Sequence, residues 1–279
     1  MFPDLGSQYK FIKELGSGGA GVVNLAIDTH SGFPVAIKSL YNRHLNNANV
    51  LNKFQTEANI YLMLEHPNIV SLKNFIIKNG NPHLVQEYFE GKTLDEYIKY
   101  VTGPIPSVQA LRIMKKIISA IDYAHNKKIP IPGYDGVLHL DIKPGNVLIS
   151  SFESVKIIDY GISQGSGQSR GDKIMGSPMY MAPEQLDVNK KIDKRTDIYA
   201  LGLLMHQMIT GSAPYSSNTT KEKLFDDINN KPLVRSFDIY PGVDKRIQII
   251  IDKATQKIPV NRYQSCNEFI EAIDKIIDK

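Results

Sequence analysis

The chain has 279 residues, of which 42% are hydrophobic, and its 33 basic and 29 acidic side chains leave a net charge of +4. This length and apolar content allow one large domain or two modest lobes. Because the basic and acidic residues nearly balance, the net charge does not favour nucleic acid as a partner. No apolar run approaches the roughly 18 residues of a membrane span and no secretory signal is visible, so we expect a cytoplasmic protein with no membrane contact within this chain. Its single cysteine, Cys266, cannot form an internal disulfide. Its oligomeric state is left open.

Short β-prone runs dominate the chain up to residue 90. Turn residues separate the runs at 9–15, 21–27, 34–40, 71–77 and 83–89. One helical pattern, at 52–66, interrupts them, and Pro67 ends it. The apolar residues near one face of this helix are Phe54, Ala58, Tyr61, Leu62 and Leu64. These patterns predict a five-stranded antiparallel sheet with one helix.

The periodicity becomes mostly helical after residue 94. Three patterns predict helices at 107–125, 197–210 and 265–279, and the second of these is apolar on most sides and is closed by Gly211. The residues expected on the buried faces of the first and third are Val108, Leu111, Met114, Ile118, Ile121, Phe269, Ile270, Ile273 and Ile277. The sequence therefore predicts an α+β architecture, with a small β-rich lobe at 1–90 and a larger α-helical lobe at 91–279.

The glycines of LGSGGAGVV, at Gly16, Gly18 and Gly21, have the spacing G-x-G-x-x-G. This spacing alone fits a dinucleotide-binding turn, a flap over a nucleoside triphosphate or a tight hairpin. A dinucleotide site needs a helix at the third glycine, whereas β-branched and alternating residues follow here, and no Gly-Lys-Ser/Thr closes the loop. The pattern therefore favours a loop between two antiparallel strands, with backbone amides that lie over phosphate oxygens.

Charged residues further along the chain supply candidate chemistry. Lys38 lies in VAIK on a predicted strand, where a lysine alone is usually a solvent-facing charge. Glu57 on the following helix would hold this ammonium against a phosphate if the helix packs on the sheet.

A second group of polar residues follows in HLDIKPGNVLI and VKIIDYGIS, which contain Asp141, Lys143, Asn146 and Asp159. A carboxylate and an amide that converge from two such loops suit Mg²⁺, which takes few protein ligands and completes its shell with substrate phosphates. Asp141 would then orient a substrate hydroxyl and accept its proton, while Lys143 neutralises charge on the transferred phosphoryl group.

With these motifs in order, the chain resembles the eukaryotic-like protein kinase family from about Tyr9 to Ile277. The residues of its motifs are most similar to those of the bacterial serine/threonine branch. The segments that carry the resemblance include VAIK, HPNIV, QEYFEG, HLDIKPGN, DYG, GSPMYMAPE, DIYALG and NRY. The resemblance implies a bilobal protein kinase-like fold. It also implies Mg²⁺-dependent transfer of the ATP γ-phosphoryl group to Ser and Thr hydroxyls of protein substrates, with Mn²⁺ as an alternative metal, and autophosphorylation in signalling.

The resemblance assigns each motif residue a role. The residues that would cover the ATP phosphates are Gly16, Ser17, Gly18, Gly19, Ala20, Gly21 and Val23. Those that would contact or border adenine are Ala36, Gln86, Glu87 and Phe89, the last two through backbone groups. Those that would act in catalysis are Lys38 with its partner Glu57, the base Asp141, the cation Lys143 and the metal ligands Asn146 and Asp159. Glu184 and Arg262 would form a buried structural ion pair.

Several positions depart from the family pattern. Leu140 stands where an arginine often binds an activation-loop phosphate, so we expect activity without strict dependence on such phosphorylation. Ser163, Ser166 and Ser169 remain candidate autophosphorylation sites. The other departures are Tyr160 for phenylalanine, expected to be benign, and Ser177 for threonine, expected to bond both Asp141 and Lys143.

Three further features carry open alternatives. Gly19 and Ala20 replace a bulky loop tip, which predicts a more mobile flap and weaker ATP retention. Residues 126–137 are longer than the usual family link, so they form either a tolerated surface insertion or a docking contact. Cys266 is expected to be a packed small residue and not a redox switch.

Two other functions are weighed against the kinase. A pseudokinase scaffold would lack at least one of Lys38, Asp141, Asn146 and Asp159, and all of these are present. A small-molecule phosphotransferase of kinase-like fold would lack APE and its arginine partner, and both are present too.

Overall fold

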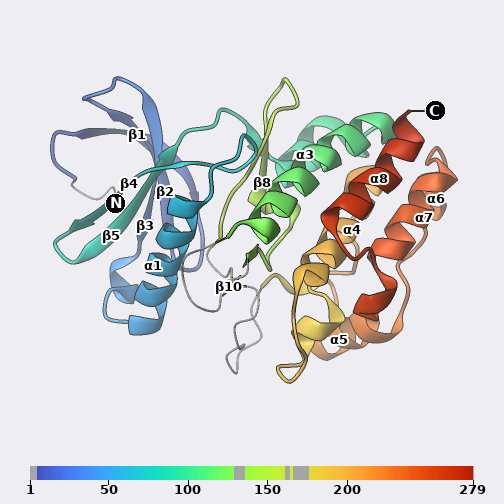
Figure 1. Ribbon diagram of the computed structural model, residues 1–279. Coiled ribbons are helices and arrows are strands. Elements are labelled where there is room, and N and C mark those ends of the chain that lie inside the picture. The colour runs from blue at the N-terminus through green and yellow to red at the C-terminus, as the bar shows by residue number, and fades with distance from the viewer. Residues whose placement is uncertain (1–4, 129–135, 161–163, 166–175, 279) are drawn as a thin grey trace. The chain divides into compact units, whose positions relative to one another are not determined.

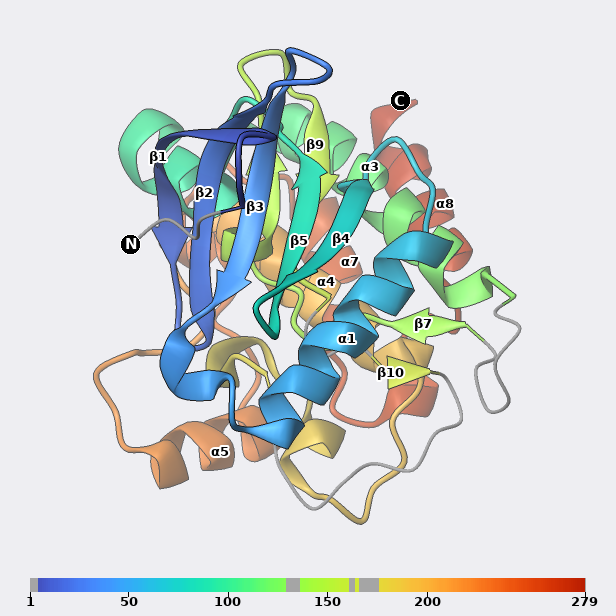
Figure 2. The ribbon, with the colours of Figure 1, turned by 90° about the vertical axis from the view of Figure 1, so that its left-hand side faces the viewer.

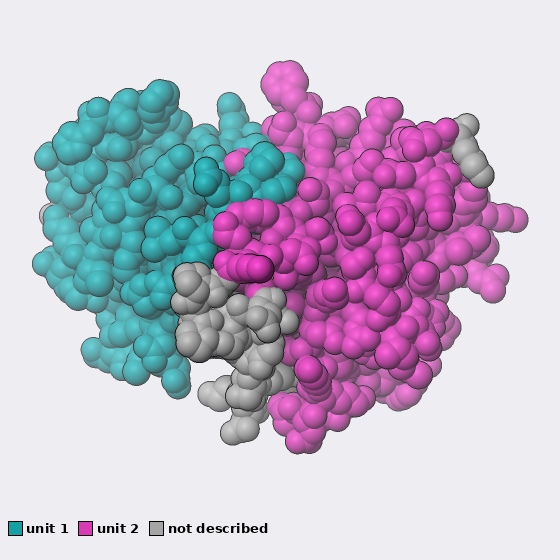
Figure 3. All heavy atoms as spheres, viewed as in Figure 1, with its two compact units in different colours: residues 1–90 teal, residues 91–279 magenta. Residues whose placement is uncertain are grey.

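The computed structural model describes residues 5–128, 136–160, 164–165 and 176–278. Its internal contacts divide the chain into two compact units, residues 1–90 and residues 91–279 (Figure 1, Figure 3). In the described part of unit 1 the elements are β1 (Tyr9–Ser17), β2 (Gly21–Asp28), β3 (Pro34–Leu40), a 3₁₀ turn (Asn42–His44), α1 (Ala48–Met63), β4 (Leu72–Lys78) and β5 (Asn81–Glu87).

The strands of unit 1 form one five-stranded antiparallel sheet, as predicted, and their order in it is β1-β2-β3-β5-β4 (Figure 2). Alternation explains its core, because successive side chains of a strand point to opposite faces. Ala26, Ile37 and Val85 from three neighbouring strands pack together with Leu5 and Tyr9. The side chains of Ala26, Ile37 and Val85 therefore lie on one face of the sheet. The residue next to each of them along its strand, such as Lys38 after Ile37, points to the opposite face.

Helix α1 begins earlier and ends earlier than the predicted 52–66. Asn47 caps its N-terminus by accepting hydrogen bonds from the backbone N–H groups of Asn49 and Val50, and the helix ends at Met63, before Pro67. Its buried residues include Phe54, which packs on the sheet with Leu40 and Leu84.

The expected buried face of α1 was partly wrong. Leu62 is 67% exposed, whereas Glu57 and Ile60 are buried. Hydrophobic periodicity assigns a glutamate to the solvent, so it does not show that this helix brings a carboxylate inside unit 1.

Unit 2 is mainly helical. Its described elements are β6 (Lys92–Thr93), α2 (Leu94–Tyr97) with a π-helical turn (Ile98–Thr102), α3 (Ser107–Asn126), β7 (Val137–Leu138), β8 (Val147–Ile149), β9 (Val155–Ile157), β10 (Gln164–Gly165), α4 (Lys194–Thr210), α5 (Lys221–Asn230), α6 (Ser236–Ile239), α7 (Lys245–Ala254) and α8 (Cys266–Ile277). Short 3₁₀ turns are formed by Pro144–Asn146, Pro178–Tyr180, Pro183–Leu186 and Pro259–Asn261.

Helix α4 lies at the centre of unit 2 and packs against α3 and α7 (Figure 1). Every residue from 196 to 210 is buried, and Gly211 ends the helix in the left-handed conformation, as predicted. Gly202 is needed where α4 meets α7, because a Cβ there would lie 2.7 Å from the Cβ of Ala254. Helix α4 is therefore a rigid support for the loops packed on it.

The other predicted helices are confirmed with small differences. On α3 the expected residues Leu111, Met114, Ile118 and Ile121 are buried, but Val108 is 51% exposed in the first turn. On α8 Phe269 and Ile273 are fully buried, and Ile270 and Ile277 are partly buried. Across the described residues, none of the helices combines the length and the apolar character that crossing a bilayer requires.

Candidate active site

The glycine loop (residues 16–21) joins β1 to β2 as a hairpin. Gly16 and Ser17 pair with Val23 and Val22, and the Gly18 N–H donates to the Gly21 carbonyl at 2.9 Å. The strand after the loop distinguishes this hairpin from a dinucleotide-binding turn, as the sequence predicted.

The glycines of this loop differ in what requires them. A Cβ on Gly21 would lie 2.0 Å from the Ser39 carbonyl oxygen, so packing demands glycine there. At Gly16, Gly18 and Gly19 the backbone φ is not positive, and a Cβ would meet no described atom within 4 Å. Neither conformation nor internal packing explains these three glycines. The open space over them suits a loop that lets a bulky anion approach its backbone amides.

Lys38 on β3 forms the expected ion pair with Glu57 on α1. The Lys38 Nζ lies 2.7 Å from Glu57 Oε1 and 2.9 Å from Oε2, and the glutamate side chain is only 3% exposed. Register places Val23 opposite Lys38, and Ala36 lies two residues before Lys38 on the same strand. Val23, Ala36 and Lys38 therefore share one face of the sheet, next to the glycine loop.

The proposed adenine residues lie at the end of unit 1. Gln86 is opposite Ala36 on the neighbouring strand and is buried. Glu87 ends β5, where its backbone N–H donates to the Ser71 carbonyl and its carboxylate accepts from the Ser71 N–H, both at 2.9 Å. Phe89 follows the strand. These bonds fix the course of the chain at Glu87, while the adenine contacts of Glu87 and Phe89 stay a prediction.

In unit 2, Asp141 is held from several directions. Its Oδ2 accepts from Lys143 Nζ at 2.8 Å and from Asn146 Nδ2 at 3.1 Å, and its Oδ1 accepts from the Ser177 backbone N–H at 2.8 Å. Lys143 Nζ also lies 2.6 Å from Ser177 Oγ. The Ser177 hydroxyl therefore bonds Lys143 as expected, whereas the contact of Ser177 with Asp141 is made by its backbone and not by its hydroxyl.

Asp197 in the first turn of α4 supports this loop, a role that the sequence motifs did not indicate. Its fully buried carboxylate accepts from the backbone N–H groups of His139 and Leu140, each at 2.8 Å, and lies 2.7 Å from His125 Nε2. Burial raises the pKa of the Asp197 carboxyl, but the hydrogen bond and charge of His125 outweigh it and bring the pKa below its ordinary value. A lone carboxylate in the otherwise apolar run 197–210 was the signal for this role.

The backbone at Leu140 is strained. Its φ of +65° lies in the left-handed region, which costs a non-glycine residue about 1–2 kcal/mol. The bond to Asp197 and a bond of 3.1 Å from Gln185 Nε2 to the Leu140 carbonyl hold this conformation. The strained residue immediately precedes Asp141, so these bonds also determine the direction in which Asp141 leaves the loop.

The Leu140 side chain occupies an apolar environment. It is buried in a cluster with Leu138 and Ile192, where an arginine would need a charged partner. This packing agrees with the expectation that activity does not strictly depend on activation-loop phosphorylation. That expectation stays a prediction. The candidate phosphorylation sites Ser163, Ser166 and Ser169 lie outside the described residues.

Asn146 and Asp159 lie on adjacent loops of unit 2. The Ile158 N–H donates to the Asn146 carbonyl at 3.0 Å, and Asp159 follows with a left-handed φ of +66°. Both bonds from Asn146 to Asp141 use its Nδ2, so its Oδ1 is the side-chain atom that could bind a metal. Among the described residues no group of three or more His, Cys, Asp or Glu could hold a metal ion. One carboxylate and one amide oxygen instead suit Mg²⁺ that also binds substrate phosphates.

Other departures have simple structural accounts. Tyr160 is fully buried, and its ring centroid lies 4.5 Å from that of His139. Cys266 is fully buried with its Sγ 3.7 Å from His125 Nδ1, and burial raises the pKa of its thiol well above the ordinary value. This environment favours the packed residue over the redox switch.

Within the longer link 126–137, residues 129–135 lie outside the described part. Gly136 has a φ of +114°, and a Cβ there would lie 2.1 Å from the His125 carbonyl.

Glu184 and Arg262 form the expected buried ion pair. The bonds are bidentate, at 2.7 and 2.8 Å, and the two side chains are 4% and 0% exposed. Arg262 also donates to the carbonyls of Gln256, Arg195 and Lys257. The guanidinium is thus fully satisfied where charge is otherwise costly to bury.

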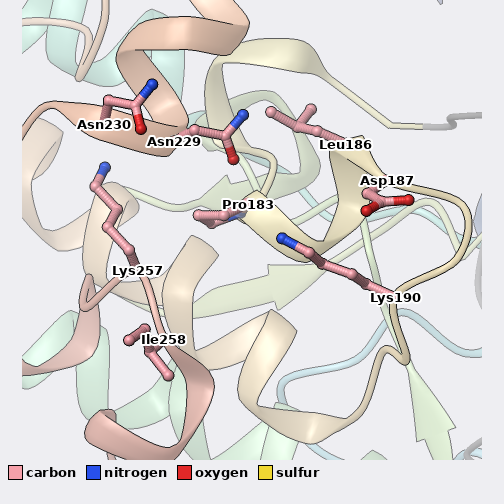
Figure 4. A pocket seen from close by; sticks show the side chains of 8 residues that line it. All are labelled: Pro183, Leu186, Asp187, Lys190, Asn229, Asn230, Lys257 and Ile258. Carbon is pink, nitrogen blue, oxygen red and sulfur yellow. The ribbon is translucent and has the colours of Figure 1, made fainter.

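A pocket of about 440 Å³ lies beside this pair in unit 2 (Figure 4). Its lining residues are Pro183, Leu186, Asp187, Lys190, Asn229, Asn230, Lys257 and Ile258. The Lys257 ammonium is within 2.6 Å of the Ile228 carbonyl and 3.3–3.4 Å of the hydroxyls of Tyr215 and Tyr199. Since Ile228 belongs to the last turn of α5, Lys257 satisfies one of the carbonyls that a helix end leaves unpaired. We assign this lysine a structural role.

We expect Lys257 to make the stability of unit 2 depend on pH. Burial, with a smaller contribution from Arg262, lowers the pKa of Lys257 from 10.5 to about 8. Between these values the unfolded chain binds more protons than the folded one, so stability rises with pH. Urea unfolding from pH 7 to 10 should show wild type gaining stability relative to Lys257→Met above pH 8. A difference between the two proteins that does not change with pH would contradict this role.

Comparisons with known proteins add to this geometry. Residues 9–276 match the family model described as protein kinase domain. The chain is 32% identical over 278 residues to serine/threonine-protein kinase PrkC of Bacillus subtilis, covering 98% of this chain and 41% of that protein. It is 28% identical over 274 residues to serine/threonine-protein kinase PknB of Mycobacterium leprae, covering 95% of this chain and 42% of that protein. The chain thus spans about two fifths of the length of these curated relatives.

Proposed function

The chain belongs to the protein kinase family, and on that premise we propose that it transfers the γ-phosphoryl group of ATP to serine and threonine hydroxyls of proteins. The observation that carries the proposal is the set of contacts that fixes both carboxylate oxygens of Asp141. A scaffold without catalysis has no need of this arrangement.

In the proposed reaction the substrate hydroxyl oxygen bonds to the γ-phosphorus while the bond from phosphorus to the β–γ bridging oxygen breaks, and ADP leaves. The hydroxyl proton passes to Asp141, which the contacts with Asn146 and Ser177 hold in one orientation. Lys143 neutralises negative charge near the transferred group, and its bond to Asp141 keeps the ammonium beside the base. Catalysis would rest on positioning and charge.

The remaining site residues would hold the nucleotide. Lys38, fixed by Glu57, would bind the α- and β-phosphates, Val23 would help the glycine loop to cover the phosphates, and Ala36 on the same face of the sheet would contact the base. Asn146 and Asp159 would hold Mg²⁺, or Mn²⁺ in its place, which would supply positive charge beside the phosphates. Protein substrates and autophosphorylation are further parts of the proposal.

The metal role of Asp159 is tested with γ-labelled ATP and a protein rich in serine and threonine. Wild type should label the protein only with added Mg²⁺, and chelation should stop the reaction. Asp159→Asn should lower labelling at least about 100-fold, because a metal ligand is lost. Asp238→Asn removes an exposed carboxylate of unit 2 and should change nothing. Labelling by Asp159→Asn at the wild-type rate and metal dependence would show that Asp159 is not a ligand.

A further inference from the structure

The carbonyl of Gly19, at the tip of the glycine loop, accepts hydrogen bonds from outside the loop. Arg43 Nη2 and His44 Nε2 each lie 3.1 Å from it. Both residues belong to the 3₁₀ turn that follows β3, more than 20 positions further along the chain. The chain thus reaches back from the end of β3 to hold the part of the loop that the sequence predicted to be most mobile.

A neighbouring residue extends this contact. The Tyr41 N–H donates to the Ala20 carbonyl at 3.0 Å, so residues 41–44 bind two successive carbonyls of the loop. The Arg43 guanidinium lies over the Tyr41 ring, 4.6 Å from its centroid. This cation–π contact limits where the guanidinium can lie and favours the position that reaches Gly19.

Arg43 and His44 do not contribute equally. His44 Nε2 lies 3.1 Å both from Arg43 Nε and from the Gly19 carbonyl. This nitrogen accepts from Arg43 in the ring tautomer that leaves it without a hydrogen and donates to Gly19 in the other tautomer, so it makes one of these bonds at a time. Arginine is always a donor, and its Nη2 bond to Gly19 is present with either tautomer. Arg43 is therefore the constant member and His44 the variable one.

The bonds to the Gly19 carbonyl fix the whole peptide unit between Gly19 and Ala20. In a trans peptide the carbonyl and the following N–H point in opposite directions, so residues that hold the Gly19 oxygen also set the direction of the Ala20 N–H. No partner is recorded for this N–H in the described part of the chain, and a Cβ on Gly18 or Gly19 would meet nothing there. A directed donor with open space beside it is suited to an anion.

We propose that Arg43 and His44 are positioning residues that aim the Ala20 N–H at the terminal phosphate of ATP. The proposal rests on the proposed kinase function, in which the glycine loop covers phosphates. Bonds from residues 41–44 replace the bulky tip residue that the loop lacks, and the weak ATP retention expected from Gly19 and Ala20 should appear only when these bonds are removed.

The test is Arg43→Ala, compared with wild type for ATP and for ADP. The KM for ATP should rise about tenfold, since a hydrogen bond to a charged phosphate loses its fixed donor, while kcat at saturating ATP stays within about twofold. ADP lacks the terminal phosphate, so its inhibition constant should change less than about twofold. In the nucleotide-free protein, amide hydrogen exchange in residues 18–21 should become faster.

Three further variants sharpen the result. Arg43→Lys keeps a cation that can reach one carbonyl and should restore part of the ATP affinity. His44→Gln keeps a donor and should have a smaller effect than Arg43→Ala. Lys10→Ala removes a positive charge from an exposed position of β1 and should leave both nucleotides and the exchange unchanged.

Equal weakening of ATP and ADP by Arg43→Ala would overturn the proposal, because it would indicate general loosening of unit 1. An unchanged KM for ATP with unchanged exchange would overturn it as well. If wild type labels no protein, the kinase function fails instead. The positioning role is then judged by direct ATP and ADP binding and by hydrogen exchange, where loss of ATP selectivity in Arg43→Ala supports it and equal affinities in the variant and wild type refute it.

Discussion

Asp141→Asn should lower kcat for protein phosphorylation about 10²- to 10⁴-fold, the usual contribution of a positioned general base. The KM for ATP should change less than about threefold, because in the proposed mechanism Asp141 acts on the substrate hydroxyl and not on the nucleotide. The substitution keeps the size of the side chain and removes its ability to take the proton. Steady-state kinetics with varied ATP separates the two constants.

The asparagine also has one acceptor oxygen where the aspartate has two. Lys143, Asn146 and the Ser177 N–H all donate to Asp141, so at least one of these donors loses its acceptor in the variant. Thermal unfolding of the variant shows whether the loss of activity comes with a loss of folding. A variant that is folded and phosphorylates protein at the wild-type rate would exclude Asp141 as the base.

Arg262→Ala should destabilise the protein by about 3–5 kcal/mol, because it leaves the Glu184 carboxylate buried without its counter-charge. The guanidinium is 0% exposed and its loss also releases three backbone carbonyls from hydrogen bonds. Urea unfolding measures the change as a shift in midpoint at constant slope.

Arg246→Ala is the matched control for this pair. Arg246 and Asp244 form a similar short ion pair, but their side chains are 50% and 33% exposed. Solvent screens such a pair, so its loss should cost much less than the loss of the buried pair. If Arg262→Ala and Arg246→Ala cost the same, burial of the Glu184–Arg262 pair has no special importance. The double variant Glu184→Gln/Arg262→Met removes both charges and should recover part of the stability.

The strands and the order of the motifs could be predicted from the sequence because they depend on local patterns. Alternation of apolar residues gave the sheet, and the strand after Gly21 distinguished a hairpin from a helix-bound turn. The pairing of Lys38 with Glu57 was predicted on condition that the helix packs on the sheet, and the family resemblance then implied it. Hydrophobic periodicity could not predict this pair, because it assigns a glutamate to solvent. The predicted burial of Leu62 and Val108 was wrong because both residues lie near the end of a helix, where periodicity locates the buried face only to within about one residue.

The residues that sequence reasoning missed act over long separations. Asp197 bonds backbone groups of His139 and Leu140, 58 and 57 positions away, and nothing near Asp197 in the sequence indicates these partners. Arg43 is an exposed arginine in a turn, a position where most charges are only solvated. Its contact with Gly19 depends on how the end of β3 lies beside the glycine loop, which only the folded sheet determines.

The central claim is that this chain is a serine/threonine protein kinase, and identification of the reaction product by mass spectrometry tests it most directly. A protein substrate is incubated with Mg²⁺, ATP and either wild type or Asp141→Asn. We predict phosphoserine and phosphothreonine in the substrate with wild type and at most traces with the variant. Phosphate found on neither sample, or only on a small molecule, would contradict the claim.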